Sequence, residues 1–510
     1  MRIALSRVLS SPRTEWIAPL ALTFVAALVR FIGLGHPQEL VFDETYYVKD
    51  AWTLLHLGYE ATWPENANAQ FAAGNTGVFA TDAAYVVHPP LGKWLIALGL
   101  ALFGAENAFG WRFSAALFGT LLVPLVYLIT RRLSGSIGVA LIAGGLLAID
   151  GLAVALSRVS LLDGFLTFFI VLAFWFLLID RDRTGRLIAE SERSAGAVVW
   201  NRPWILAAGA SLGAACAIKW SGLYVLAGVG VYLVVWDALQ RRRSGSREWY
   251  AAALLKQAPV TFLQLVPIVF VVYLVSWTGW LVTSGGYDRG SDPNPLLALW
   301  NYHRSMYQFH VGLGTSHPYA SPAWQWPFLT RPTAMWLNRP EAGTATCGWA
   351  GDCIAVIGSH ANPIAWYGAW AAVILAIVLL IRRRAGRLTF PFALALLGLA
   401  LTWGPWLLYP ERTIFQFYTV TMLPFLLILL ALALGWLARE REPLVLEGAT
   451  VSERAYVTRH AATATRAWRT SVGVFLLIAV VVGLFFLPLA TGLLQPYALW
   501  YAHMWVPGWI

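Results

Sequence analysis

Charged side chains are scarce in this chain. Aspartate, glutamate, lysine and arginine together make up 12% of its 510 residues, whereas hydrophobic residues make up 58%. Soluble domains carry about 25% charged residues, so this composition excludes a soluble globular protein and is typical of a polytopic helical membrane protein. Nucleic-acid binding is also disfavoured, because the basic residues stand beside apolar segments and form no recognition motif.

Apolar runs of the length that a bilayer requires, about 17–25 residues, recur from end to end. They predict an all-α polytopic membrane protein that forms a single transmembrane domain over residues 1–510. Eleven helices are expected to span the membrane, near residues 16–34, 111–131, 136–156, 160–180, 203–219, 221–237, 260–283, 364–381, 388–409, 414–438 and 470–490. The shorter apolar run at 91–104 is expected to lie in the membrane interface.

Lysine and arginine are unevenly distributed among the connections between these segments. Most of the 36 lysines and arginines fall in alternate connections, and the positive-inside rule places those connections in the cytoplasm. The N-terminus is then cytoplasmic, and the C-terminus lies on the outer face of the cell membrane. Two long loops, residues 35–110 and 284–363, also lie outside, so the function is expected on that face.

Cysteine is rare as well, with three residues in the chain. Cys216 lies within a predicted span and is expected to be a small packing residue. Cys347 and Cys353 lie in the second outer loop, where the redox conditions permit disulfides, and glycines between them permit a tight turn. We expect a disulfide. Metal binding is the alternative, but two thiols without a neighbouring histidine make a poor metal site.

Two adjacent carboxylates, Asp43 and Glu44, follow the first predicted span. A charge near the low dielectric of a membrane is poorly solvated, so the pair is costly unless it has a role. Four aromatic residues surround it: Phe42, Tyr46, Tyr47 and Trp52. Such rings pack against the C–H faces of sugars, and a carboxylate can take a hydroxyl proton. An ordinary polar loop with interfacial aromatic anchors is the alternative interpretation.

Cations and polar side chains occupy several outer turns between the predicted spans. They are His88 and Lys93 in the first loop, Arg158 and Asp163 between the third and fourth spans, Lys219 between the fifth and sixth, and Arg412 after the ninth. Each of these residues could instead have a purely structural role, such as a local ion pair or, for Lys219, extension to the lipid headgroups. Together they bring cations to the face where Asp43 emerges, as a lipid-linked phosphate would require.

The second outer loop contains an aromatic-rich stretch, Trp300 to His310, that predicts an amphipathic helix. His303 and His310 are seven residues apart and share one face of that helix. A zinc-binding pair on a helix needs a spacing of three or four residues, so no metal site is expected here. The helix is expected to cover a sugar or peptide groove. Interfacial anchoring by its aromatic residues is the alternative.

An ordered set of motifs, extending from about residue 30 to the end, resembles the protein O-mannosyltransferases. The motifs are Phe42-Asp43-Glu44, His88-Pro-Pro-Leu-Gly-Lys93, Ser157-Arg158-Val-Ser-Leu-Leu-Asp163, Lys219-Trp-Ser-Gly222, Ser276-Trp-Thr-Gly-Trp280 and the C-terminal segment from Trp500 to Trp509. The resemblance implies a GT-C type fold. It also implies the transfer of mannose from polyprenyl phosphate to Ser or Thr of exported proteins, with the export machinery as a further partner. The 80-residue loop 284–363 has no room for the soluble β-trefoil repeats of eukaryotic members, which resembles the actinobacterial branch.

The resemblance maps the acidic pair of the family onto Asp43 and Glu44, and its arginine after the third span onto Arg158. Asp43 is expected to be the base in a single, inverting displacement, and Glu44 to orient the loop or a sugar hydroxyl. The remaining expected roles are donor-phosphate binding by Arg158, Lys219 and Arg412, and substrate binding or lid formation by His88, Lys93, Asp163, His303 and His310.

The sequence neither requires nor excludes a divalent cation. Two other functions stay open. One is a related transferase that acts on a lipid or glycan. The other is a transporter, which the crowding of charges at one surface and the lack of an internal repeat disfavour.

Overall fold

The computed structural model describes residues 12–191, 197–341, 347, 351–440 and 450–510. Its helices are α2 (Pro12–Phe31), α3 (Glu44–Leu57), α4 (Ala67–Ala72), α5 (Leu91–Phe103), α6 (Ala108–Ser134), α7 (Ile137–Ile149), α8 (Gly151–Arg158), α9 (Leu162–Ser191), α10 (Pro203–Ile218), α11 (Ser221–Arg243), α12 (Trp249–Ala251), α13 (Ala258–Ser276), α14 (Thr278–Val282), α15 (Pro295–Gly312), α16 (Pro363–Ile381), α17 (Thr389–Trp403), α18 (Leu423–Ala438), α19 (Val451–Thr491) and α20 (Tyr497–Ala502). A π-helical turn, Ala252–Gln257, joins α12 to α13. Short 3₁₀ turns are Ala323–Phe328, Gly386–Leu388, Gly404–Leu408, Gln416–Thr421 and Pro507–Trp509.

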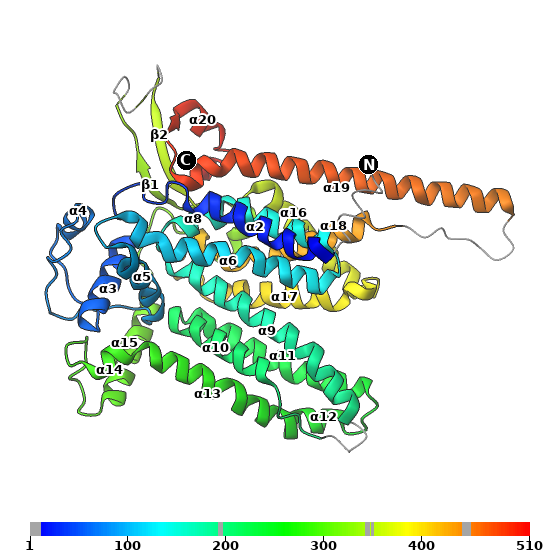
Figure 1. Cartoon of the computed structure of the whole chain (residues 1–510), viewed down its shortest axis with the longest axis horizontal. Coiled ribbons are helices and arrows are strands. Elements are labelled where there is room, and N and C mark those ends of the chain that lie inside the picture. The colour runs from blue at the N-terminus through cyan, green and yellow to red at the C-terminus, as the bar shows by residue number, and fades with distance from the viewer. Residues whose placement is uncertain (1–11, 192–196, 342–346, 348–350, 441–449) are drawn as a thin grey trace.

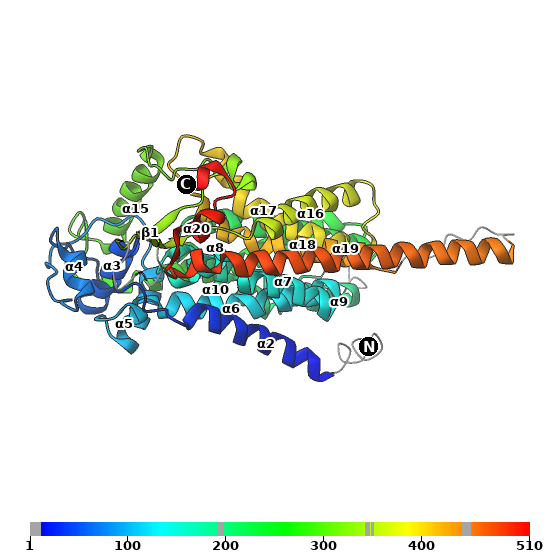
Figure 2. The same cartoon turned by 90° about the horizontal axis from the view of Figure 1, so that it is seen from above.

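The long helices run side by side and form a bundle (Figures 1 and 2). At one end of the bundle lie the shorter helices α3, α4, α5, α14 and α15, which belong to the two long loops (Figure 1). From the other end the first half of α19 projects beyond the bundle (Figures 1 and 2). The two loops expected to carry the function therefore meet at one end.

Seven stretches of helix are long and apolar enough to cross a membrane: Ala108–Ser134, Leu162–Glu190, Ser221–Arg243, Trp249–Ser276, Pro363–Ile381, Gly386–Leu408 and Val451–Thr491. The bent pair of α7 and α8 is an eighth if it forms one span. All eleven expected segments contain helix, but α10 and α18 have only 16 residues each and α2 is not among the candidate spans. Within the described residues, the candidate spans thus number seven or eight.

The third expected span, near 136–156, is broken at Asp150. The axes of α7 and α8 meet there at 53°. One carboxylate oxygen of Asp150 accepts hydrogen bonds from the N–H groups of Leu152 and Ala153, and the other accepts from the N–H of Asn362, at 3.0 Å. The carboxylate therefore caps α8 and joins it to the chain that precedes α16.

The second outer loop contains a small sheet, which corrects the expectation of an all-α protein. Strand β1 (Ala334–Asn338) pairs antiparallel with β2 (Cys353–Gly358), and β2 pairs antiparallel with β3 (Gln495–Pro496). The six residues of β2 are all buried. The sheet brings the C-terminal segment to the end of the bundle where the two long loops lie (Figure 1).

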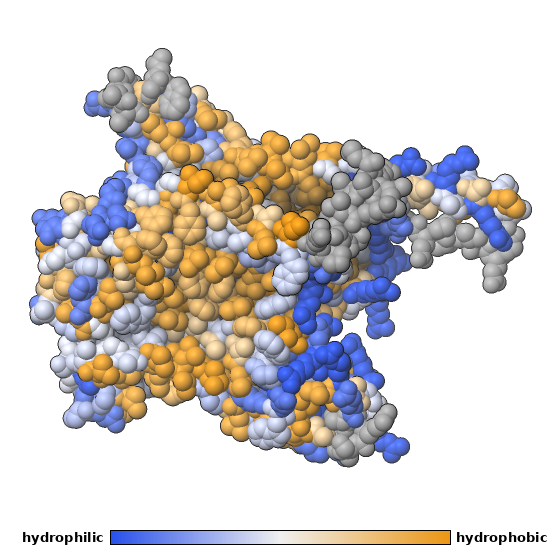
Figure 3. Space-filling model, viewed as in Figure 1, coloured by the Kyte–Doolittle hydropathy of each residue, from blue (hydrophilic) through white to orange (hydrophobic). Residues whose placement is uncertain are grey.

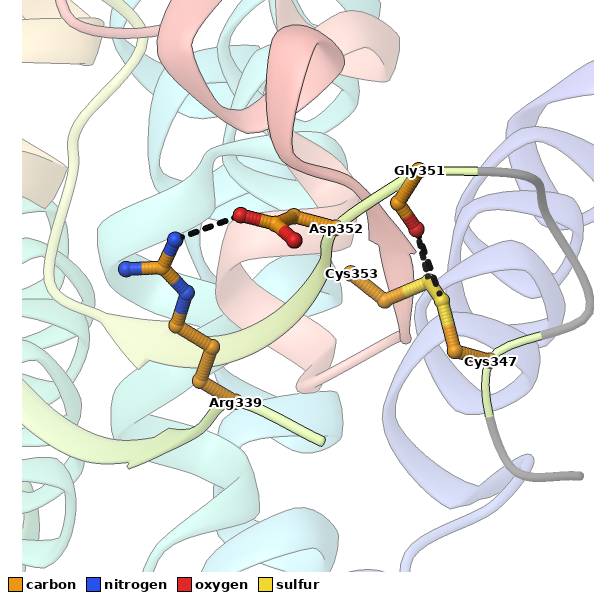
Figure 4. The surroundings of a disulfide bond; sticks show 5 residues. All are labelled: Arg339, Cys347, Gly351, Asp352 and Cys353. Carbon is orange, nitrogen blue, oxygen red and sulfur yellow. Dashed lines mark hydrogen bonds and ion pairs between the residues drawn. A yellow bond between two sulfur atoms is a disulfide. The ribbon is translucent and has the colours of Figure 1, made fainter. Parts of the chain in front are cut away.

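A disulfide joins Cys347 to Cys353 at the start of β2, as the sequence predicts (Figure 4). Beside it, the Arg339 guanidinium pairs with Asp352 at 2.7 Å, and both side chains are about half exposed. Cys216 is a buried free thiol. The disulfide and the ion pair hold the end of the hairpin formed by β1 and β2.

Apolar residues cover the middle of the bundle on the face that Figure 3 shows, and hydrophilic residues gather towards both ends. This surface suits a multi-pass membrane protein. The charge distribution leads us to expect that the end with the two long loops is the outer one.

Cysteine labelling tests this orientation. Asn75 and Ser244 are exposed. The expected topology places Asn75 on the outer side of the membrane and Ser244 on the cytoplasmic side. Since Cys216 is buried and the other cysteines are paired, new thiols can be detected above the background. A membrane-impermeant maleimide should label Asn75→Cys in intact cells and Ser244→Cys only after permeabilisation. The reverse pattern would contradict the proposed orientation.

Candidate active site

Asp43 lies in the turn that begins α3. The preceding residue, Phe42, has φ of +50°, a conformation that bulky residues rarely adopt. Its ring is held edge-on between Phe415 and Phe417, at centroid distances of 6.1 and 5.6 Å. Aromatic packing between distant parts of the chain therefore fixes the backbone from which the Asp43 side chain projects.

The surroundings of Asp43 favour a carboxyl that can exchange a proton near neutral pH. Burial raises its pKa to about 6, and this effect outweighs the opposing influence of Lys219. Asp163 raises the pKa further, whereas a hydrogen bond with the Tyr47 side chain lowers it. A base with a pKa close to the operating pH is best suited to accept a proton.

Glu44 is fully buried. Its carboxylate accepts two hydrogen bonds from the Arg112 guanidinium, both at 2.8 Å. It also accepts from the N–H groups of Val41, at 3.0 Å, and Ser160, at 2.9 Å. Because both oxygens are occupied, the structure gives Glu44 the role of holding the Asp43 turn and does not place it among groups that could react.

Arg112 was not among the predicted site residues. It also donates to the carbonyls of Pro37, at 2.8 Å, and Glu39, at 2.9 Å, so it organises the chain that leads from α2 to Asp43. In the sequence, the only indication that Arg112 could belong to the site was its position at the outer end of a predicted span. Its partner, Glu44, is 68 positions away.

Arg158 is buried and is bonded to the chain at the end of α2. Its guanidinium donates to the carbonyls of Val29, Arg30, Ile32 and Gly33 at 2.8–3.2 Å. These carbonyls belong to the last turn of α2 and the residues that follow it. Carbonyls at a helix C-terminus lack intrahelical partners, although that of Gly33 also accepts from the N–H of His36 at 3.2 Å. The structure thus gives Arg158 a helix-capping role.

A cavity of about 290 Å³ lies between α11, α15 and the segment around Arg412. It is lined by His88, Lys219, Trp220, Ser221, Leu223, Tyr224, Tyr307, His310, Val311, Pro405, Trp406, Tyr409, Arg412 and Tyr418. Four of the predicted site residues, His88, Lys219, His310 and Arg412, therefore meet here. A fifth, Asp163, pairs with the Lys219 ammonium at 2.7 Å.

Burial disfavours the charged form of the two histidines in this cavity. Burial lowers the pKa of His310 to about 4, and burial and Lys219 lower the pKa of His88 well below its usual value. The Nε2 atom of His310 donates to the carbonyl of Val87 at 2.7 Å, so its Nδ1 atom accepts from Arg412 at 3.0 Å. Lys219 and Arg412 are thus the cations available to an anionic ligand.

Lys93 and His303 lie outside this cavity. The buried ammonium of Lys93 forms an ion pair with Glu60 and donates to the carbonyl of His88. His303 is bonded to the Tyr273 hydroxyl at 2.6 Å and packs on Trp220. Both residues position neighbouring elements. Among the described residues, no group of three histidine, cysteine or acidic side chains could hold a metal ion.

The chain is a mostly helical, multi-pass membrane protein that carries an acidic turn and a cationic cavity at one end of its helical bundle. Known structures support the fold. The yeast protein O-mannosyltransferase Pmt1-Pmt2 complex bound to the sugar donor matches with a TM-score of 0.69 at 16% identity, over 99% of this chain and 94% of that chain. ArnT from Cupriavidus metallidurans bound to undecaprenyl phosphate matches with a TM-score of 0.51 at 16% identity, over 94% and 77%.

The chain belongs to the protein O-mannosyltransferase family. Residues 20–282 match the family of dolichyl-phosphate-mannose-protein mannosyltransferases, and residues 296–509 match the C-terminal four-helix membrane region of protein O-mannosyltransferases. The polyprenol-phosphate-mannose–protein mannosyltransferase of Mycobacterium tuberculosis is 35% identical over 82% of this chain and 81% of its own length. The corresponding protein of Corynebacterium glutamicum is 31% identical over 96% and 92%.

Proposed function

We propose that this chain transfers mannose from a polyprenyl-phosphate carrier to Ser and Thr hydroxyls of exported proteins at the outer membrane face. The observation that carries the proposal is the Asp43 carboxyl, which has a raised pKa and interacts electrostatically with Lys219 at the cationic cavity. The names of the bacterial relatives give the same donor and acceptor classes.

In the proposed reaction, Asp43 accepts the proton of the acceptor hydroxyl while that oxygen attacks the anomeric carbon of mannose. The bond from this carbon to the phosphate oxygen breaks on the opposite face, so the anomeric configuration inverts. One base is sufficient, because the leaving phosphate needs charge stabilisation more than a proton. The burial of Glu44 against Arg112 supports this one-base mechanism, which differs from the two flanking carboxylates of glycosidases.

Lys219 and Arg412 are proposed to bind the donor phosphate, Lys219 as a point charge and Arg412 through its planar guanidinium. Tyr307 and His310 bring α15 over the same cavity, which supports the interpretation of α15 as a cover over the donor. The neutral imidazole of His310 would orient Arg412 without competing for the phosphate.

The test is the incubation of purified protein with labelled polyprenyl-phosphate mannose and one of two acceptors. Transfer to a Ser/Thr-rich peptide is expected. The second candidate function is transfer to a lipid or glycan, because the acidic turn and the cationic cavity would serve such an acceptor equally. Labelling of a lipid or glycan acceptor with no labelling of the peptide would favour that second function.

The pH dependence should report the ionisation of Asp43. The carboxyl must be deprotonated to act as a base, and its pKa is about 6, so kcat/KM should fall about tenfold per pH unit below that value. Lys219 opposes the rise in the pKa of Asp43. Replacing it in Lys219→Met should therefore move the acid limb to higher pH and raise the KM for the donor.

Lys219→Arg is the control for that variant, because it keeps the cation beside Asp163 and the phosphate. We expect a pH profile close to that of the unmodified protein. If the acid limb of the pH profile lies at the same pH for Lys219→Met and Lys219→Arg, Lys219 does not lower the pKa of Asp43.

A further inference from the structure

A second, polar cleft opens on the outer surface beside the donor cavity. It has a volume of about 200 Å³ and lies between residues 314–322 and residues 410–414. Arg412 lines both the cleft and the donor cavity. Anything bound in the cleft would therefore lie next to the proposed donor phosphate.

Hydrogen bonds between the two segments fix both ends of this cleft. The N–H of Thr413 donates to the carbonyl of Leu313 at 3.1 Å, and the N–H of Ser321 donates to the carbonyl of Ile414 at 2.8 Å. Between these two bonds the residues from Gly314 to Ser316 are exposed, and the Thr413 hydroxyl donates to the carbonyl of Thr315. The cleft is thus a gap between two segments that are tied together on either side of it.

Polar groups without partners face this gap. The hydroxyl of Ser321, which lines the cleft, is completely buried and has no hydrogen-bond partner within the described part of the chain. In the same described residues, the backbone N–H groups of positions 314–317 make no backbone hydrogen bond. A buried hydroxyl is costly to leave unpaired, and a row of free N–H groups is the element that an added extended peptide pairs with.

Aromatic rings connect the cleft to Asp43. The His317 ring lies 4.9 Å from the ring of Phe415, and Phe415 lies 6.1 Å from Phe42, the residue next to Asp43. An extended chain advances about 3.3 Å per residue. These two ring-to-ring steps therefore correspond to about three or four residues of an extended polypeptide.

We infer that this cleft binds the part of the acceptor polypeptide that flanks the reacting hydroxyl, in an extended conformation and mainly through its backbone. The inference rests on the proposed function. Backbone recognition suits an enzyme that must accept many sequences, because the peptide backbone is common to all of them. The exposed Glu411 carboxylate lines the cleft. Arg412, which also lines it, is bonded to His310 and is proposed to bind the donor phosphate. A basic flanking residue is therefore bound better than an acidic one.

The first test narrows the cleft. Gly314 lines it, and a Cβ at this position would meet only the carbonyl oxygen of Glu411, at 3.6 Å. Gly314→Leu therefore fits the backbone and fills part of the cleft. It should raise the KM for a Thr-containing peptide several-fold and leave the KM for labelled polyprenyl-phosphate mannose unchanged. Gly290→Leu is the matched control, since Gly290 lies in the same loop with open space around it.

The second test reverses a surface charge. We compare two peptides that carry Lys or Glu at the third and fourth positions on both sides of a single Thr. The unmodified protein should prefer the Lys peptide, and Glu411→Lys should prefer the Glu peptide. Glu411 is exposed, so the fold tolerates Glu411→Lys. If Gly314→Leu is not recovered from membranes, the peptide preference of Glu411→Lys alone tests whether the cleft binds the acceptor.

The outcomes separate the two proposals. If the unmodified protein transfers mannose to both peptides but neither variant changes peptide KM or preference, the cleft is not the acceptor site and the proposed function stands. A rise in donor KM equal to that in peptide KM for Gly314→Leu also overturns the inference. If the unmodified protein transfers no mannose to any peptide, the proposed function itself fails.

Discussion

Asp43→Asn should reduce kcat by at least about a hundredfold, as loss of a general base usually does. The amide keeps the shape of the carboxylate but accepts a proton poorly. The KM for the donor should change little, because the proposed phosphate ligands are Lys219 and Arg412. The measurement is mannose transfer from labelled polyprenyl-phosphate mannose to a Thr peptide under single-turnover conditions.

Asp50→Asn provides the control for this variant. Asp50 is seven positions further along α3 and is also buried, and burial raises its pKa to about 7. The amide therefore resembles a protonation state that Asp50 already populates near neutral pH. We expect nearly unchanged kcat. Normal turnover in Asp43→Asn would show that another group takes the proton.

The sequence predicted the helices well because their signal is local. Each of the eleven apolar runs contains helix, although only seven or eight are candidate spans among the described residues, and the aromatic stretch Trp300–His310 lies within α15. The break at Asp150 was missed, although an Asp-Gly pair interrupts the apolar run there. Asp150 is bonded there to Asn362, 212 positions away, and a local pattern contains no information about such a partner.

The sheet in the second loop was missed for a similar reason. Strand β1 is only five residues long, and the short strand β3 pairs with β2 from the far end of the chain. Strands this short have weak periodicity. The disulfide was easier to predict, because Cys347 and Cys353 are only six positions apart and have no nearby rival for pairing.

For the candidate site, the sequence predicted which charged side chains lie near the outer face, but not which groups each of them contacts. Lys219, Arg412, His88 and His310 do line one cavity, since each follows or precedes an outer helix end. Arg158 has the same position in the sequence pattern, yet it caps α2. Whether a cation meets a ligand or a helix end depends on how the helices pack, and that packing is set by contacts far apart in the sequence.

The buried pair of Glu44 and Arg112 should be the most costly ion pair to break among those described at this end of the molecule. Neither side chain has any exposed surface. Removal of one partner from a buried pair leaves an uncompensated charge and costs about 3–5 kcal/mol. Arg112→Met should therefore lower the apparent Tm in detergent by several degrees. It should also reduce kcat, because the turn that carries Asp43 loses its anchor.

Two further variants separate this effect from a general loss of charge. Arg339→Met breaks the half-exposed pair with Asp352 and should cost less than about 1 kcal/mol, since surface pairs are weak. The double variant Glu44→Gln with Arg112→Met removes both charges and should recover part of the lost Tm, because no charge is then buried alone. Recovery of Tm without recovery of kcat is the expected pattern, since the uncharged pair cannot reproduce the hydrogen bonds that hold residues 37–44. Equal Tm values for Arg112→Met and Arg339→Met would contradict the anchoring role of the buried pair.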